Sequence, residues 1–125
     1  MIYFPMSCRI LTKGHIKALE YLTQFDFVMV GLLTKKAMKG YKDELVPYKD
    51  RLYILETIAR SIEDISIVPQ DSLDPTKNIR KYKCNSIASG DGWTKEELKA
   101  IKKLKIKRID FDSGEKLHSS NVLDG

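Results

Sequence analysis

The tetrapeptide Thr12-Lys13-Gly14-His15 combines residue types that suit the binding of a phosphate group. The amphipathic pattern that follows it predicts a helix beginning at about Gly14. The first turn of a helix presents free N–H groups and a partial positive charge, and glycine lets an anion approach the backbone closely. His15 can then donate a hydrogen bond to an oxygen that gains negative charge in a transition state. The alternative is that His15 is a solvent-exposed first-turn residue without such a role.

The elements that must position this segment alternate between strands and helices. Strands are predicted at residues 2–4, ending at Pro5, within FDFVMVGLL at residues 25–33, and at residues 65–68, 85–89 and 106–111. Helices are predicted from about Gly14, from Pro47, at residues 76–82, and from Thr94 with Glu97 as its capping-box partner. This alternation predicts an α/β fold: a Rossmann-like doubly wound parallel sheet of about five strands with helices on both faces, forming a single domain over residues 1–125.

Apolar residues at helical spacing predict which side of each helix is buried. The expected stripes are Ile16, Leu19, Leu22 and Phe25 in the first helix, Leu55, Ile58, Ala59 and Ile62 in the second, and Leu98, Ile101 and Leu104 in the last. The lysine-rich stretch TKKAMKGYKDEL, residues 34–45, has no apolar period and is predicted to be a mobile basic loop. In doubly wound sheets ligands bind at the carboxyl ends of the strands. TKGH, KGYK, PQDS, GDGW and the HSS tail all follow predicted strands, so we expect them to meet at one edge.

The segment SCRILTKGHIKALEYL resembles the first signature of a nucleotidyltransferase superfamily. This superfamily includes glycerol-3-phosphate and choline-phosphate cytidylyltransferases and phosphopantetheine adenylyltransferase, and its signature reads His or Thr, any residue, Gly, His. Thr12 to His15 match the threonine version. Further resemblances follow in order: the lysines of KGYK, the Arg of VPYKDRLYILETI, the GDGW segment, and a terminal Ser-Ser.

The resemblance implies that a substrate phosphate attacks the α-phosphate of a nucleoside triphosphate and releases pyrophosphate, without a covalent enzyme intermediate. The enzyme must align two anions, the substrate phosphate and the triphosphate, and stabilise the negative charge that builds up during the reaction. Such a site therefore requires cationic side chains and N–H donors. GDGW is closest to the cytidylyltransferase form, which favours CTP over ATP and a phosphorylated small alcohol such as glycerol 3-phosphate as the acceptor. The resemblance also implies Mg²⁺ and a homodimer. The alternatives are an adenylyltransferase that uses ATP and a non-catalytic nucleotide-binding module of the same fold.

Roles follow by resemblance for individual residues. The catalytic candidates are His15, Thr12 and Lys42. The nucleotide-binding candidates are Ser7, Gly14, Lys39, Asp91, Trp93, Ser119 and Ser120. Arg51 is the candidate for the acceptor phosphate, and no residue is assigned as a metal ligand.

Each assignment outside the first signature has a structural alternative. The lysines fit a solvated charge run, and Arg51 fits a surface salt bridge to Asp50 or Glu56. Trp93 fits a packing residue at a helix entry, and the terminal serines fit a frayed polar tail.

The chain also departs from the pattern of the family. Cytidylyltransferases have Gly-Thr-Phe-Asp where this chain has Met6-Ser7-Cys8-Arg9, so that Met6 replaces a glycine and Arg9 reverses a charge. The terminal Ser-Ser resembles the end of the family's second signature, Arg-Thr-x-Gly-Ile-Ser-Thr-Thr, but this chain lacks the leading Arg-Thr and the Gly-Ile of that signature. We expect these changes to alter substrate specificity before they abolish activity, although a weakly active or non-catalytic member is the alternative.

Composition and charge limit the location of the protein, the state of its cysteines and the partners that it can bind. The chain has 125 residues, a net charge of +5, and no apolar run long enough to cross a bilayer or to serve as a signal peptide, so a cytoplasmic location is expected. Cys8 and Cys84 are expected to stay reduced. The basic run between Lys99 and Arg108 spans a helix end and a strand without interleaved aromatic residues, which disfavours nucleic-acid binding.

Overall fold

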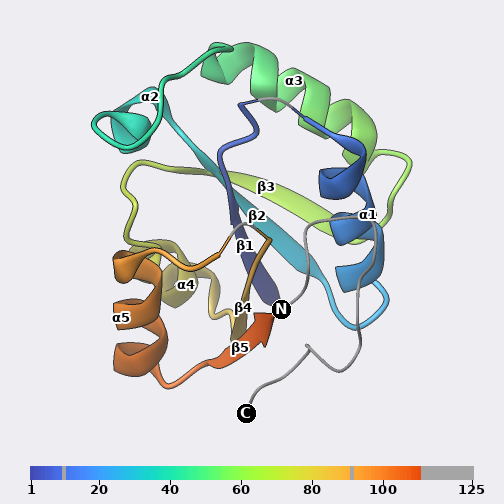
Figure 1. Ribbon diagram of the computed structural model, residues 1–125. Helices are drawn as coiled ribbons and strands as arrows, with labels where there is room; N and C mark the ends of the chain where they lie inside the picture. The colour runs from blue at the N-terminus through green and yellow to red at the C-terminus, as the bar shows by residue number, and fades with distance from the viewer. Residues whose placement is uncertain (10, 91, 111–125) are drawn as a thin grey trace.

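A parallel five-stranded sheet forms the centre of the molecule (Figure 1). The computed structural model describes residues 1–9, 11–90 and 92–110. The strands are β1 (Ile2–Met6), β2 (Val28–Leu33), β3 (Ile65–Gln70), β4 (Ser86–Ser89) and β5 (Lys107–Asp110), in the order β3-β2-β1-β4-β5. Every neighbouring pair is parallel, which confirms the predicted doubly wound α/β architecture.

Helices cover both faces of this sheet (Figure 1). The helices are α1 (Lys13–Leu22), α2 (Lys35–Met38), α3 (Tyr48–Ala59), α4 (Thr76–Tyr82) and α5 (Lys95–Leu104). Because side chains alternate along a strand, Phe4 of β1 packs with Leu19 and Leu55 of α1 and α3, whereas Tyr3 packs with Ile79 and Ile101 of α4 and α5. All six residues of β2 are buried, as expected of a strand covered on both sides.

Strand β1 continues through Pro5 to Met6, so the predicted end at Pro5 is wrong. Pro5 pairs with Gly31 of β2 but lies beyond the register with β4, which includes Ile2 and Tyr3. A proline is tolerated in a strand where one side has no ladder partner for its missing N–H. The extra two residues carry the strand up to Ser7.

Two of the predicted apolar stripes are partly wrong. Helix α1 ends at Leu22, and Phe25 lies in the following turn with 57% of its surface exposed. Leu98 is 43% exposed, and Glu97 and Ala100 are the residues of α5 that are buried. Spacing alone does not fix the rotation of a helix about its axis, because packing against the sheet decides it.

Residues 35–38 form the short helix α2, where a loop was predicted. The hydroxyl of Thr34 accepts a hydrogen bond from the backbone N–H of Ala37, and Ala37 and Met38 are buried against Leu33. This turn of helix therefore anchors the start of the basic segment. Within the described part of the chain, no helix has the length and apolarity needed to cross a membrane.

Candidate active site

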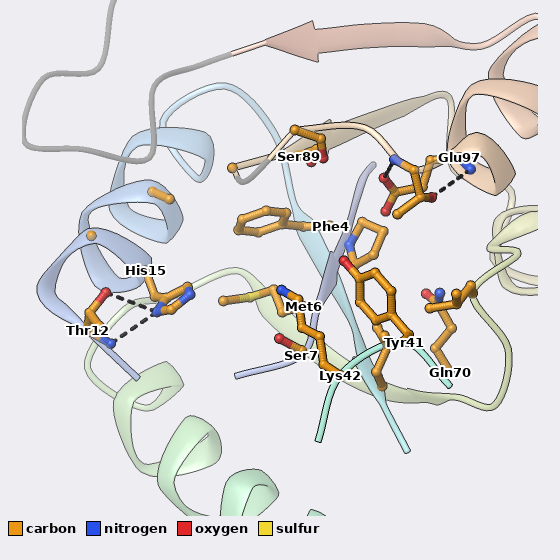
Figure 2. A pocket seen from close by; sticks show the side chains of 18 residues that line it. Phe4, Met6, Ser7, Thr12, His15, Tyr41, Lys42, Gln70, Ser89 and Glu97 are labelled. Carbon is orange, nitrogen blue, oxygen red and sulfur yellow. Dashed lines mark hydrogen bonds between the residues drawn. The ribbon is translucent and has the colours of Figure 1, made fainter. Parts of the chain in front are cut away.

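A cavity of about 290 Å³ lies at the carboxyl ends of β1 and β4 (Figure 2). The chain order reverses between these two strands, and ligands of doubly wound folds bind at such a point. The cavity is lined by the ends of β1, β2 and β3, the first turns of α1, the segment after α2, and the segment that joins β4 to α5.

The side chains of Thr12 and His15 occupy one wall of the cavity (Figure 2). The Nδ1 atom of His15 accepts a hydrogen bond from the backbone N–H of Thr12 at 3.0 Å, and the Thr12 hydroxyl lies 3.1 Å from the same nitrogen. A ring nitrogen that accepts a hydrogen bond carries no proton, so this geometry assigns the proton of the neutral imidazole to Nε2. The imidazole ring of His15 is thus held in one orientation, and its Nε2–H group can donate a hydrogen bond to a ligand.

This arrangement is a capping box in which histidine replaces the usual Glu or Gln at the third helical position. Thr12 and His15 together occupy backbone donors at the start of α1, and the His15 side chain is half-buried. His15 is therefore a first-turn residue of intermediate exposure that takes part in the helix cap.

Lys42 and Tyr41 form the opposite wall (Figure 2). Their backbone N–H groups bond to the carbonyl of Met38 at the end of α2, and the Lys42 ammonium lies 5.1 Å from the centre of the Tyr41 ring. Gly40, with a φ of 79°, turns the chain between them and α2. Lys39 precedes this turn and is exposed outside the cavity lining, so the structure separates the two lysine candidates.

Five predicted site residues line this one cavity: Ser7, Thr12, Gly14, His15 and Lys42. They come from the end of β1, from α1 and its cap, and from the segment after α2. Three further candidates, Asp91, Ser119 and Ser120, lie outside the described residues.

Trp93 does not belong to the cavity lining. Its Nε1 atom donates a hydrogen bond to Asp110, and Arg108 lies over its ring at 5.3 Å from the centre. The indole also packs against the core that contains Ile87. Trp93 thus has the environment of a packing residue.

Arg51 is also placed differently from either expectation. Its side chain is buried, and it pairs with Glu44 rather than with Asp50 or Glu56. The guanidinium also donates to backbone carbonyls, including that of Ser7, and lies over the ring of Tyr48 at 5.6 Å from its centre. The residue lies outside the cavity lining.

Glu97 is a cavity residue that the sequence indicated only as a helix cap. Its carboxylate accepts a hydrogen bond from the N–H of Thr94 at 2.9 Å, which confirms the predicted capping box. Burial raises the pKa of the Glu97 carboxyl, and the hydrogen bonds from Thr94 oppose that shift only in part. The cavity is therefore cationic and donor-rich near Lys42 and His15, and carboxyl-lined on the α5 side.

Gln70 is a second cavity residue that sequence reasoning missed. The Tyr3 hydroxyl donates to its side-chain carbonyl at 2.6 Å and accepts from Asn78 at 2.9 Å. Burial raises the pKa of Tyr3, which keeps the hydroxyl protonated as the donor. A Cβ added at Gly31 would lie 1.9 Å from the Tyr3 hydroxyl oxygen. The glycine inside an otherwise apolar strand was the available signal for this close approach.

Comparison with known proteins identifies the family of the chain. A search of curated protein sequences finds no significant match. The model of the family described as cytidylyltransferase-like matches residues 9–120, which is most of the chain. The match includes α1 and the segments that bring Thr12, His15 and Lys42 to the cavity. The chain therefore belongs to the cytidylyltransferase-like family and is a nucleotidyltransferase.

Proposed function

We propose that the protein transfers CMP from CTP to a phosphorylated small alcohol, such as glycerol 3-phosphate, and releases pyrophosphate. One observation carries this proposal: Ser7, Thr12, His15 and Lys42 converge on a single cavity at the switch point of the sheet. Their hydrogen-bond donors and positive charge suit a triphosphate. The proposed reaction requires no nucleophile from the protein, because the acceptor phosphate attacks directly.

In the proposed reaction, an oxygen of the acceptor phosphate forms a bond to the α-phosphorus of CTP. The bond between that phosphorus and the bridging oxygen breaks, and the electron pair leaves with pyrophosphate. His15 donates from Nε2 to an α-phosphate oxygen, and Lys42 faces the phosphates from the opposite wall. The positive end of the α1 helix dipole adds to the positive potential.

Magnesium is expected to enter with the nucleotide. Among residues 1–9, 11–90 and 92–110, no group of three His, Cys, Asp or Glu side chains is arranged to hold a metal ion. Mg²⁺ commonly binds through substrate phosphates and retained water rather than through a protein cage, so this site fits a metal that arrives with the triphosphate. The chemistry that it supplies is neutralisation of phosphate charge.

Met6 and Arg9, two residues at which the chain departs from the family pattern, lie in different places relative to the cavity. Met6 lines it, whereas Arg9 lines a separate apolar groove between α1 and α3. We therefore assign altered substrate specificity to Met6. We further propose that the enzyme works as a homodimer in the cytoplasm, and that Asp91, Ser119 and Ser120 contribute to nucleotide binding.

The test is pyrophosphate release by purified protein with Mg²⁺, each of CTP, ATP, GTP and UTP, and a panel of phosphorylated alcohols. His15→Ala is the inactivating variant, and Glu20→Ala is the matched control because Glu20 is exposed on the same helix. Release that depends on CTP and one acceptor, and that only His15→Ala abolishes, supports the proposal. Release with ATP instead identifies an adenylyltransferase, and nucleotide binding without turnover identifies a non-catalytic module.

A further inference from the structure

The guanidinium of Arg51 lies behind the cavity, at a point where several of its lining segments meet. Arg51 is 2% exposed. Its Nε atom donates a hydrogen bond to the Val46 carbonyl at 2.8 Å. One terminal nitrogen donates to the carbonyls of Ser7 at 2.7 Å and Leu33 at 2.6 Å. The other terminal nitrogen donates to the Glu44 carboxylate at 2.5 Å. Four contacts of this kind use most of the donors that an arginine side chain has.

The partners of Arg51 share one property: they belong to, or adjoin, the segments that line the cavity. Ser7 directly follows β1 and Leu33 ends β2, and both line the cavity themselves. Glu44 and Val46 follow Lys42 closely in the chain. Arg51 therefore joins the carboxyl ends of two strands to the segment that carries Lys42.

The segment between α2 and α3 is held at both ends. At the α2 end, the N–H groups of Tyr41 and Lys42 bond to the Met38 carbonyl. At the α3 end, Arg51 holds Glu44 and Val46. Tyr41 and Lys42 lie between these anchors and reach the cavity. Without the second anchor, only one turn of helix would define where the Lys42 ammonium lies.

We infer that Arg51 is a positioning residue that acts on the reaction through Lys42, and that it does not itself bind the acceptor phosphate. The carbonyls and the Glu44 carboxylate leave its charge compensated inside the protein. Lysine cannot reproduce this role, because its donors share one nitrogen and cannot span carbonyls from three segments. This inference rests on the proposed function for its effect on turnover, but its effect on the segment is independent of any activity.

The first test measures how fast trypsin cleaves the native protein after Lys39 and Lys42. The variants are Arg51→Lys and Glu44→Gln, with Arg60→Lys as the control because Arg60 is exposed at the end of the same helix. We expect cleavage at these two sites to accelerate about tenfold in Arg51→Lys and less in Glu44→Gln, with no change in the control. Equal cleavage rates in folded Arg51→Lys and wild type would overturn the inference, and Glu44→Gln provides the same test if Arg51→Lys fails to fold.

The second test is a double-mutant cycle on pyrophosphate release. Arg51→Lys should lower kcat about tenfold in the wild-type background with a smaller effect on KM, but should have little effect when Lys42 is already Gln. An equal loss in both backgrounds would show that Arg51 does not act through Lys42. A loss confined to the KM of the acceptor would restore Arg51 as an acceptor-binding residue. Failure of the wild type to release pyrophosphate would contradict the proposed function alone, since the trypsin result stands without it.

Discussion

The two walls of the cavity are held in place in different ways. On the α1 wall, His15 is fixed by Thr12, three residues earlier in the chain. On the opposite wall, Lys42 depends on Arg51, whose partner Ser7 lies 44 residues from it in sequence, and Gln70 depends on Tyr3, 67 residues away. The first wall is a local structure that a short sequence encodes. The second exists only when β1, β2, β3 and α3 have packed together.

This difference predicts that damage to the two walls has different consequences. A change on the α1 wall should remove chemistry while leaving the fold intact. A change behind the opposite wall should reduce the free energy of unfolding, because the same contacts support the sheet and the site.

The largest effect is expected from Gly31→Ala, behind the opposite wall. The added Cβ would lie 1.9 Å from the Tyr3 hydroxyl oxygen and 2.6 Å from the Gln70 side-chain oxygen. Overpacking of this kind costs about 3 kcal/mol, and displacement of Tyr3 would also break its hydrogen bonds. Urea unfolding of the variant and the wild type measures the change. A loss below about 1 kcal/mol would show that Tyr3 moves aside easily and that this wall is less constrained than we infer.

The second effect compares the walls by activity. His15→Ala should lower kcat about a hundredfold, since it removes a donor fixed toward the developing charge, and Lys42→Gln should lower it about tenfold. Both variants should retain the wild-type unfolding free energy within about 1 kcal/mol. Steady-state pyrophosphate release and urea unfolding give the two quantities. The reverse order of activities would move the main charge stabilisation to the Lys42 side.

A smaller effect is expected from Thr12→Ala on the α1 wall. Loss of the cap hydroxyl should reduce the unfolding free energy by about 1 kcal/mol, and a less constrained His15 ring should lower kcat several-fold. Thr12→Ser keeps the hydroxyl and is the matched control. Thermal unfolding with parallel kinetics tests both, and a full loss of activity in Thr12→Ser would assign a role to the threonine methyl group instead.

The smallest effect concerns pH and the α5 side of the cavity. The pKa of Glu97 is raised by burial, so the folded protein binds this proton more tightly than the unfolded chain does. Its contribution to stability is complete below the unfolded pKa of about 4.3 and is lost as the pH rises through the folded pKa. Glu97→Gln should remove this decline, so that the variant gains stability relative to wild type between acidic and neutral pH. Melting temperatures measured across that range check it, and parallel curves for the two proteins would contradict it.

Much of the fold was predictable because its signals are local. The buried run in β2, the helix α4, the capping box of Thr94 and Glu97, and the start of α1 were all confirmed. Local patterns were insufficient where packing decides. Phe25 and Leu98 match the spacing of a buried stripe but are exposed, and Pro5 continues a strand because β4 does not extend that far.

The residues of the candidate site also fall into those placed by local sequence and those placed by tertiary packing. The sequence by itself determined the local arrangement of Thr12 and His15, for which we propose phosphate binding, since a helix start and a residue three positions later suffice to build it. Only the tertiary structure decided that Lys42 and not Lys39 reaches the cavity, that Arg51 is buried behind it, and that Gln70 and Glu97 line it. The physical reason is that these side chains are placed by contacts between segments far apart in the chain, and sequence periodicity carries no information about those distances.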